Sequence, residues 1–173
     1  AALPIPAAGY CTGYDADLDL AAMIRRGLVD LRGAGARRIA LLTWERGGVR
    51  PCFEEHAAAL GLETRPHWIA GAFQPTLPGA GWEAFRELWT AYPEKPDGLL
   101  VLDDVFFDGA AQAIGGMGIA VPGELRVATH ANRRPVNAPP PFPCFRYIFD
   151  PADAAAALTG LLQRRLAGDP PPA

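Results

Sequence analysis

Two adjacent carboxylates, Asp103 and Asp104, follow directly after the apolar run of residues 99–102. An aspartate in this position can accept hydrogen bonds from ligand hydroxyl groups, and it can equally cap a helix that follows. We assign Asp103 to ligand binding and Asp104 to structure. Neighbouring side chains on one chain usually point apart, and no Ser-His or Cys-His partner accompanies the pair, so we predict no catalytic residues and no enzyme.

Two further polar side chains are candidates for ligand recognition. Arg50 carries a planar guanidinium whose parallel donors suit a carboxylate or a pair of hydroxyl groups, although a solvated arginine at a helix start is the simpler interpretation. Asn132 offers one donor group and one acceptor, which suit hydroxyl recognition and a turn equally well. Both residues therefore stay open between binding and structure at this point.

Two aromatic residues in predicted loops, Tyr10 and Phe73, are candidates for stacking on the apolar face of a sugar. Packing within the loop is the alternative for each. The three histidines show no ligand spacing, so we predict no metal site; only His130 lies near the predicted binding residues. The sequence contains neither GxGxxG nor a P-loop, and we therefore expect no cofactor.

The bulk composition narrows the class of protein. The 173 residues, half of them hydrophobic, suffice for one ordinary domain or two linked α/β layers. A net charge of −3 argues against a surface that binds nucleic acid phosphates on its own. The three cysteines are odd in number and far apart, which favours reduced thiols in a cytoplasmic protein, and no apolar run is long enough for a membrane span.

The hydrophobic pattern predicts short strands that alternate with helices. We expect strands at 3–8, 39–43, 67–70, 99–102, 125–129 and 145–149. We expect helices from Leu20 to a stop at Gly33 or Gly35, from Arg50 or Pro51 to Gly61, over 79–92, from directly after Asp104 through Ile114, and from Pro151 to a stop at Gly168. The strands are apolar throughout, which predicts a parallel sheet with helices on both faces. Ligands bind outside the carboxyl ends of such strands, and the candidate residues all follow predicted strands.

Two of the predicted helices carry apolar stripes that we expect to be buried. In the helix at 79–92 the stripe is Trp82, Phe85, Trp89 and Tyr92. In the last helix it is Ala155, Leu158, Leu162 and Leu166, with Asp150 as the N-cap and Gly168 as the stop signal.

The order of these features resembles the effector-binding domain of the LacI/GalR transcription regulators. GAGARRIALL is similar to the family's Gly-His-Arg-Arg-Ile strand entry, with Ala36 in place of histidine, and GGVRPCFEEHAAALGL is similar to the segment with the ligand-binding arginine, here Arg50. HWIAGAF resembles the stretch that ends in an aromatic residue against the ligand, here Phe73. The block KPDGLLVLDDVFFDGAAQAIGGMGIAVPGELRVATHAN resembles the family's strand, Asn-Asp or Asp-Asp, helix, Gly-Ile-x-Val-Pro and strand.

The resemblance implies a type I periplasmic-binding-protein-like α/β fold, present as the carboxyl lobe plus part of the amino lobe. We expect residues 1–37 to be a remnant of the amino lobe, 38–144 the carboxyl lobe, and 145–173 the return strand and helix of the amino lobe with a proline-rich tail. It implies a cytoplasmic homodimer that binds a small effector, most simply a sugar, in the interlobe cleft. The operator DNA would be bound by a helix-turn-helix that this fragment lacks.

One departure from the family pattern concerns the binding site. The family carries Gly-Tyr-Asp-Asn at the end of the last strand of the block, whereas this chain has Thr129, His130, Ala131 and Asn132, so the usual ligand-contacting aspartate is absent. Two alternatives to a regulator stay open. One is a periplasmic sugar-binding protein of a transport system, and the other is an α/β enzyme that uses Asp103 and Asp104.

Overall fold

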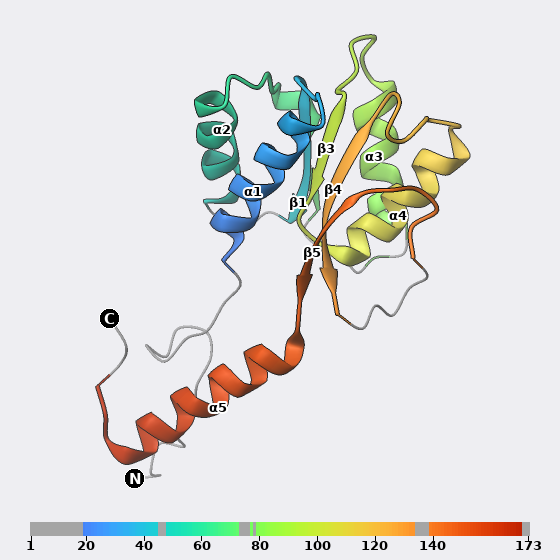
Figure 1. The fold of residues 1–173 in the computed structure, drawn as a ribbon. Coiled ribbons are helices and arrows are strands. Elements are labelled where there is room, and N and C mark those ends of the chain that lie inside the picture. Colours follow the sequence, from blue (N-terminus) through green and yellow to red (C-terminus); the bar gives the residue numbers. More distant parts are fainter. Residues whose placement is uncertain (1–18, 45–47, 73–76, 78, 134–138, 171–173) are drawn as a thin grey trace. The chain divides into compact units, whose positions relative to one another are not determined.

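The computed structural model describes residues 19–44, 48–72, 77, 79–133 and 139–170 (Figure 1). The chain divides into two compact units, one formed by Leu20–Phe149 and the other by the segments Ala1–Asp19 and Asp150–Ala173. We describe each unit by itself. The predicted strand at 3–8 lies outside the described residues.

The larger unit is built on a five-stranded sheet in which every strand pair is parallel. The strands are β1 (Ile39–Trp44), β2 (Ile69–Ala72), β3 (Gly98–Val101), β4 (Arg126–Asn132) and β5 (Phe145–Phe149), in the order β2-β1-β3-β4-β5. The parallel α/β fold predicted from the short apolar strands is therefore confirmed.

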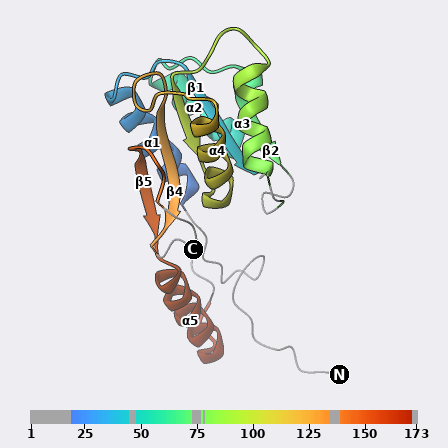
Figure 2. The same ribbon diagram turned by 90° about the vertical axis from the view of Figure 1, so that its right-hand side faces the viewer.

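Helices cover both faces of this sheet, as Figure 2 shows. On one face lie α1 (Leu20–Gly33) and α2 (Val49–Ala59); on the other lie α3 (Ala80–Thr90) and α4 (Asp104–Gly116). Successive residues of a strand face opposite sides, so β1 contributes to both hydrophobic cores. Ile39 and Leu41 pack with α1 and α2, whereas Ala40 and Leu42 pack with α3 and α4.

The contact between α3 and α4 is close because it is made through glycines. A Cβ atom on Gly81 would lie 2.1 Å from the carbonyl oxygen of Phe106. This approach directs Gly81, Phe85 and Leu88 into the core. The stripe predicted for α3 is therefore wrong in part: Phe85 is buried, but Trp82 and Tyr92 are 37% and 46% exposed. Trp82 lies beside the inward face that the glycine contact selects, and Tyr92 lies beyond the end of the helix at Thr90.

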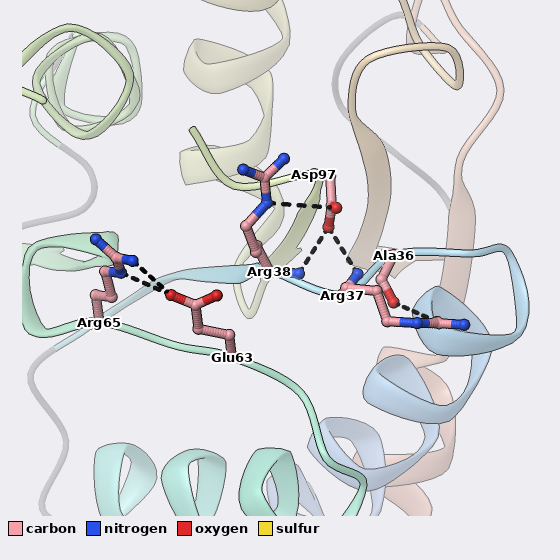
Figure 3. Close-up of polar contacts among 6 residues, drawn as sticks. All are labelled: Ala36, Arg37, Arg38, Glu63, Arg65 and Asp97. Atoms are coloured by element: carbon pink, nitrogen blue, oxygen red, sulfur yellow. Dashed lines mark hydrogen bonds and ion pairs between the residues drawn. The ribbon is translucent and has the colours of Figure 1, made fainter. Parts of the chain in front are cut away.

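The amino edge of the sheet is held together by the carboxylate of Asp97 (Figure 3). Its Oδ1 accepts hydrogen bonds from the backbone N–H groups of Arg37 and Arg38, at 2.8 and 2.7 Å. Its Oδ2 lies 3.6 Å from Nε of Arg38. This carboxylate thus fixes the start of β1 against the start of β3, while Arg65 pairs with Glu63 at 2.7 Å on the exposed surface nearby.

Two boundaries expected from the sequence, at 37/38 and 144/145, fall inside the larger unit. Helix α1 precedes the first boundary but packs against β3, β4 and β5. Strand β5 follows the second boundary but pairs with β4 in register, with His130 opposite Tyr147. The compact unit therefore takes in both flanking elements.

In the smaller unit, α5 (Pro151–Ala167) begins and ends as predicted. The side chain of Asp150 accepts a hydrogen bond from Ala152 N at 2.9 Å, and Gly168 ends the helix with φ of 84°. The predicted buried stripe is wrong, however: no residue of α5 is buried and Leu166 is 65% exposed, because no described segment of its own unit covers it. Among the described helices, none has the length and apolarity needed to cross a membrane.

Candidate functional site

The topology of the sheet identifies one place where a ligand site is expected. The chain passes from β1 outward to β2 and then crosses back to β3 on the other side of β1. The connections after β1 and β3 therefore lead to opposite faces of the sheet, into α2 and α4. Such a switch point leaves a crevice outside the carboxyl ends of the two strands. Arg50 follows β1, and Asp103 and Asp104 follow β3, so the structure places three predicted residues at this edge.

Asp103 and Asp104 have different partners. Asp103 is 8% exposed and is the N-cap of α4, where its Oδ1 accepts a hydrogen bond from Phe106 N at 2.9 Å. The capping role that we had assigned to Asp104 therefore belongs to Asp103. Strand β3 ends at Val101, one residue before the end of the apolar run, so the helix begins one residue earlier than we assumed. Asp103 has the extended backbone angles of an N-cap residue, and Asp104 is already the first residue of the helix. Whether Asp103 also contacts a ligand stays a prediction.

Asp104 is joined to Asn132 across the sheet edge. Nδ2 of Asn132 donates to Oδ2 of Asp104 at 2.6 Å, which links the end of β4 to the first turn of α4. Both side chains are partly buried, and each retains polar atoms beyond this one bond. Two residues that the sequence predicted separately, 28 positions apart, thus form one polar pair.

His130 lies two residues before Asn132 on β4, on the same face of the strand. Its ring is buried, with 8% exposure, and no described residue forms a hydrogen bond with Nδ1 or Nε2. The ring lies 6.1 Å from that of Phe149, centroid to centroid. Leaving a buried polar group without a partner costs about 1–3 kcal/mol, so this imidazole is a polar group whose hydrogen-bonding capacity the described residues leave unused.

Arg50 lies in the first turn of α2, half exposed, with its Nε 2.9 Å from Oε1 of Glu54. The two residues lie one helical turn apart on the exposed surface, where an ion pair contributes little to stability. No described contact joins Arg50 to Asp104 or Asn132. Its role in binding, like that of the other predicted site residues, stays a prediction.

The two predicted aromatic contacts, Tyr10 and Phe73, lie outside the described residues. Within the described part of the chain, no group of three or more histidine, cysteine, aspartate or glutamate side chains is placed to hold a metal ion. From the sequence, His130 stands out only by its position after a predicted strand. Its lack of a partner among the described residues follows from the packing of segments far apart in the chain.

An open parallel sheet with helices on both faces and polar side chains at its switch point belongs to the class of α/β folds that hold ligands at their strand ends. A model of the periplasmic binding protein-like domain family matches residues 29–173. The match extends over most of the chain, and the protein belongs to this family. No curated protein matches the chain.

Solved structures of transcription regulators share the fold. The Escherichia coli transcriptional repressor ascG matches with a TM-score of 0.71 at 20% identity, over 93% of this chain and 59% of that chain. A LacI family transcriptional regulator from Lactobacillus casei with bound TRIS matches with a TM-score of 0.74 at 20% identity, over 88% and 57%. The same regulator with bound glucose matches with a TM-score of 0.71 at 21% identity, over 88% and 58%.

The chain thus spans less than two thirds of the length of each of these regulators. At such identities the similarity establishes the fold, and it confirms the predicted resemblance to the effector-binding domains of LacI-family regulators at that level.

Proposed function

We propose that this chain is the effector-binding part of a LacI-type transcription regulator, and that it binds a small polyhydroxylated ligand, a sugar, at the carboxyl edge of its sheet. In the complete protein this edge forms one wall of the cleft between two lobes. The regulator acts in the cytoplasm as a homodimer, is not an enzyme, and binds its DNA operator through a helix-turn-helix outside this sequence.

The observation that carries the proposal is the hydrogen-bonded pair of Asp104 and Asn132 at the carboxyl edge, with His130 two residues before Asn132 on β4. The carboxylate accepts hydrogen bonds, the amide both donates and accepts, and the imidazole nitrogens have no hydrogen-bond partner among the described residues. Such a mixture suits hydroxyl groups, each of which also donates and accepts. Bound glucose in the Lactobacillus casei regulator is consistent with this chemistry.

Coupling to DNA follows from differential affinity. A ligand that binds the closed arrangement of two lobes more tightly than the open one shifts the population by that difference in free energy. The polar pair of Asp104 and Asn132 supplies such a difference if the ligand reaches it only when the second lobe closes over this edge.

Thermal unfolding of the complete protein with a panel of monosaccharides, disaccharides and sugar phosphates tests the ligand class. A ligand at a hundred times its dissociation constant stabilises the folded state by about 2.7 kcal/mol. The shift should be lost in Asp104→Ala and Asn132→Ala. Asp108→Asn is the matched control, because Asp108 lies one turn further along α4 and bonds Gln112 on the exposed surface. An equal shift in all three variants would contradict the proposed site.

Operator binding tests the regulatory part. Arg50→Ala in the complete protein should abolish the effector response and leave basal operator binding intact, whereas Arg25→Ala, an exposed change on α1, should preserve both. A complete protein that binds a sugar but no DNA, and carries a cleaved leader, would instead support the transport alternative.

A further inference from the structure

A pocket of about 390 Å³ opens at the amino edge of the sheet, the end opposite to the proposed effector site. Four chain segments form it: the turn after α1, the segment before β4, the first residues of β4 and the residues that lead into β5. The lining side chains include Ala34, Pro122, Arg126, Pro143, Cys144 and Phe145. Its volume lies within the range of about 300–1,000 Å³ that is usual for small-molecule sites.

Among the described residues that line the pocket, Arg126 is the one that carries a charge. Its Nε donates to the carbonyl oxygen of Ala34 at 3.0 Å, and its backbone N–H donates to the carbonyl oxygen of Asp97 at 3.0 Å. The first bond holds the guanidinium at Nε, and the second holds the backbone of the residue. Among the described residues, one of the five N–H donors of the guanidinium has a partner. Arg126 forms no ion pair with any residue that the structure describes, so among these residues no carboxylate compensates its charge at this pocket.

The remaining walls are apolar and stiff. Pro122 and Pro143 have fixed φ angles, and Phe145 is the first residue of β5, with 38% of its surface exposed. Cys144 is half-buried, and burial raises the pKa of its thiol, with Arg146 opposing the effect more weakly. A neutral thiol is a small apolar surface, which leaves the guanidinium as the charged group among the described lining residues.

We propose that this pocket binds a small hydrophobic carboxylate, such as an aromatic or branched-chain acid. The carboxylate pairs with the free face of the Arg126 guanidinium, and the hydrocarbon part lies against Pro122, Pro143 and Phe145. A guanidinium can form two parallel hydrogen bonds to the two oxygens of a carboxylate, and a neutral ligand lacks the charge that strengthens this pairing. The site is separated from the proposed effector site by the full length of β4, so two ligands bind without direct contact.

Cys144 provides a direct readout of occupancy, because it lines the pocket, and Cys52 on α2 does not. We would measure the alkylation rates of both thiols by peptide mass mapping on the 173-residue chain, with phenylacetate as the probe. At ten times its dissociation constant, the probe should slow alkylation of Cys144 by about ten-fold and leave Cys52 unchanged. The uncharged analogue 2-phenylethanol should protect Cys144 much less.

Variants separate the role of the charge from that of folding. Arg126→Gln should weaken protection by about ten-fold or more, since a hydrogen bond to a charged group is lost. Arg126→Lys should retain part of the effect, and Arg25→Gln, on the surface of α1, should retain all of it. The proposal is overturned if phenylacetate leaves the Cys144 rate unchanged, if 2-phenylethanol protects equally well, or if protection depends on protein concentration instead, as a second molecule of the chain in the pocket would require.

Discussion

The hydroxyl of Tyr147 in β5 donates a hydrogen bond to Oδ2 of Asp30 in α1, with an O–O distance of 2.9 Å. The same carboxylate oxygen accepts from Nε of Arg26 at 2.9 Å. Strand β5 lies at the edge of the sheet and has a neighbouring strand on one side only. The bond from Tyr147 therefore attaches this edge strand to the helix layer as well as to β4.

Replacing Tyr147 with Phe removes only the hydroxyl. We expect the free energy of unfolding to fall by about 1 kcal/mol, because a bond to a carboxylate is lost at a half-buried site. Urea denaturation gives the measurement. Tyr92→Phe is the matched control, since Tyr92 is 46% exposed, and its change should stay within about 0.5 kcal/mol. Equal effects of the two substitutions would show that the bond to Asp30 contributes nothing.

The same tyrosine predicts a dependence of stability on alkaline pH. Burial raises the pKa of Tyr147 above the ordinary value of 10.0, and the hydrogen bond to Asp30 raises it further. A group that holds its proton more tightly when folded contributes stability that is complete below the unfolded pKa and is lost as the pH rises through the folded pKa. Wild type should therefore lose more stability than Tyr147→Phe as the pH rises above 10.0. Urea midpoints on both sides of that pH measure the difference, and parallel curves would contradict the assignment.

Gly81 should not tolerate even one added methyl group. In a helix interior, Gly→Ala is ordinarily stabilising by up to about 1 kcal/mol. At Gly81 the new Cβ would meet the backbone oxygen of Phe106 at 2.1 Å, so α3 must move away from α4, and we expect a loss of about 1–3 kcal/mol. Gly115→Ala in α4 is the control, because nothing lies within 4 Å of its added Cβ, and it should be neutral or stabilising. Thermal unfolding of both variants gives the measurement. Changes of the same sign in the two unfolding temperatures would refute the expectation.

Asp97 should matter far more than the charged pairs around it. Asp97→Ala leaves the backbone N–H groups of Arg37 and Arg38 without their acceptor, and we expect the free energy of unfolding to fall by about 2 kcal/mol. Glu63→Gln alters an exposed ion pair with Arg65 and should change it by less than about 0.5 kcal/mol. Chemical denaturation of the two variants provides the comparison; a result in the reverse order would sink this account of the amino edge.

Asp103 can be probed for its two roles separately. Asp103→Ala removes the N-cap of α4 and should cost about 1 kcal/mol, while Asp103→Asn keeps an acceptor oxygen for Phe106 N and should cost much less. If Asp103 also contacts the effector, Asp103→Asn should weaken effector binding despite its near-normal stability. Calorimetric titration alongside thermal unfolding distinguishes a cap alone from a cap that also binds ligand.

The sequence pattern predicted the larger unit well, and the physical reason is local. Buried parallel strands need continuous apolar runs, and the run at 99–102 gave β3 almost to the residue. The Asp150 cap and the Gly168 stop depend only on neighbouring backbone, so α5 was bounded correctly. The face of each helix was harder to predict: Trp82 and Leu88 differ in burial because Gly81 sets how α3 meets α4.

The candidate site was predictable only in part. That Asp103, Asp104 and Asn132 follow strands could be read from the chain, and a parallel sheet brings such residues to one edge. Which aspartate caps α4 depended on a single residue of register. The missing partners of His130 and the pocket beside Arg126 arise from segments far apart in the sequence, and no local pattern encodes them.

The larger unit begins with α1 and ends with β5, and both of those ends lie at the carboxyl edge of the sheet. Helix α1 runs opposite to the strands and enters β1 through a short turn at the amino edge, whereas β5 runs toward the carboxyl edge (Figure 1). A domain whose first and last residues lie on the same side can be inserted into another chain, or removed from it, with little change in the path of that chain. Residues 20–149 therefore have the geometry of a transferable cassette, which recombination can exchange between proteins along with the proposed ligand-binding edge.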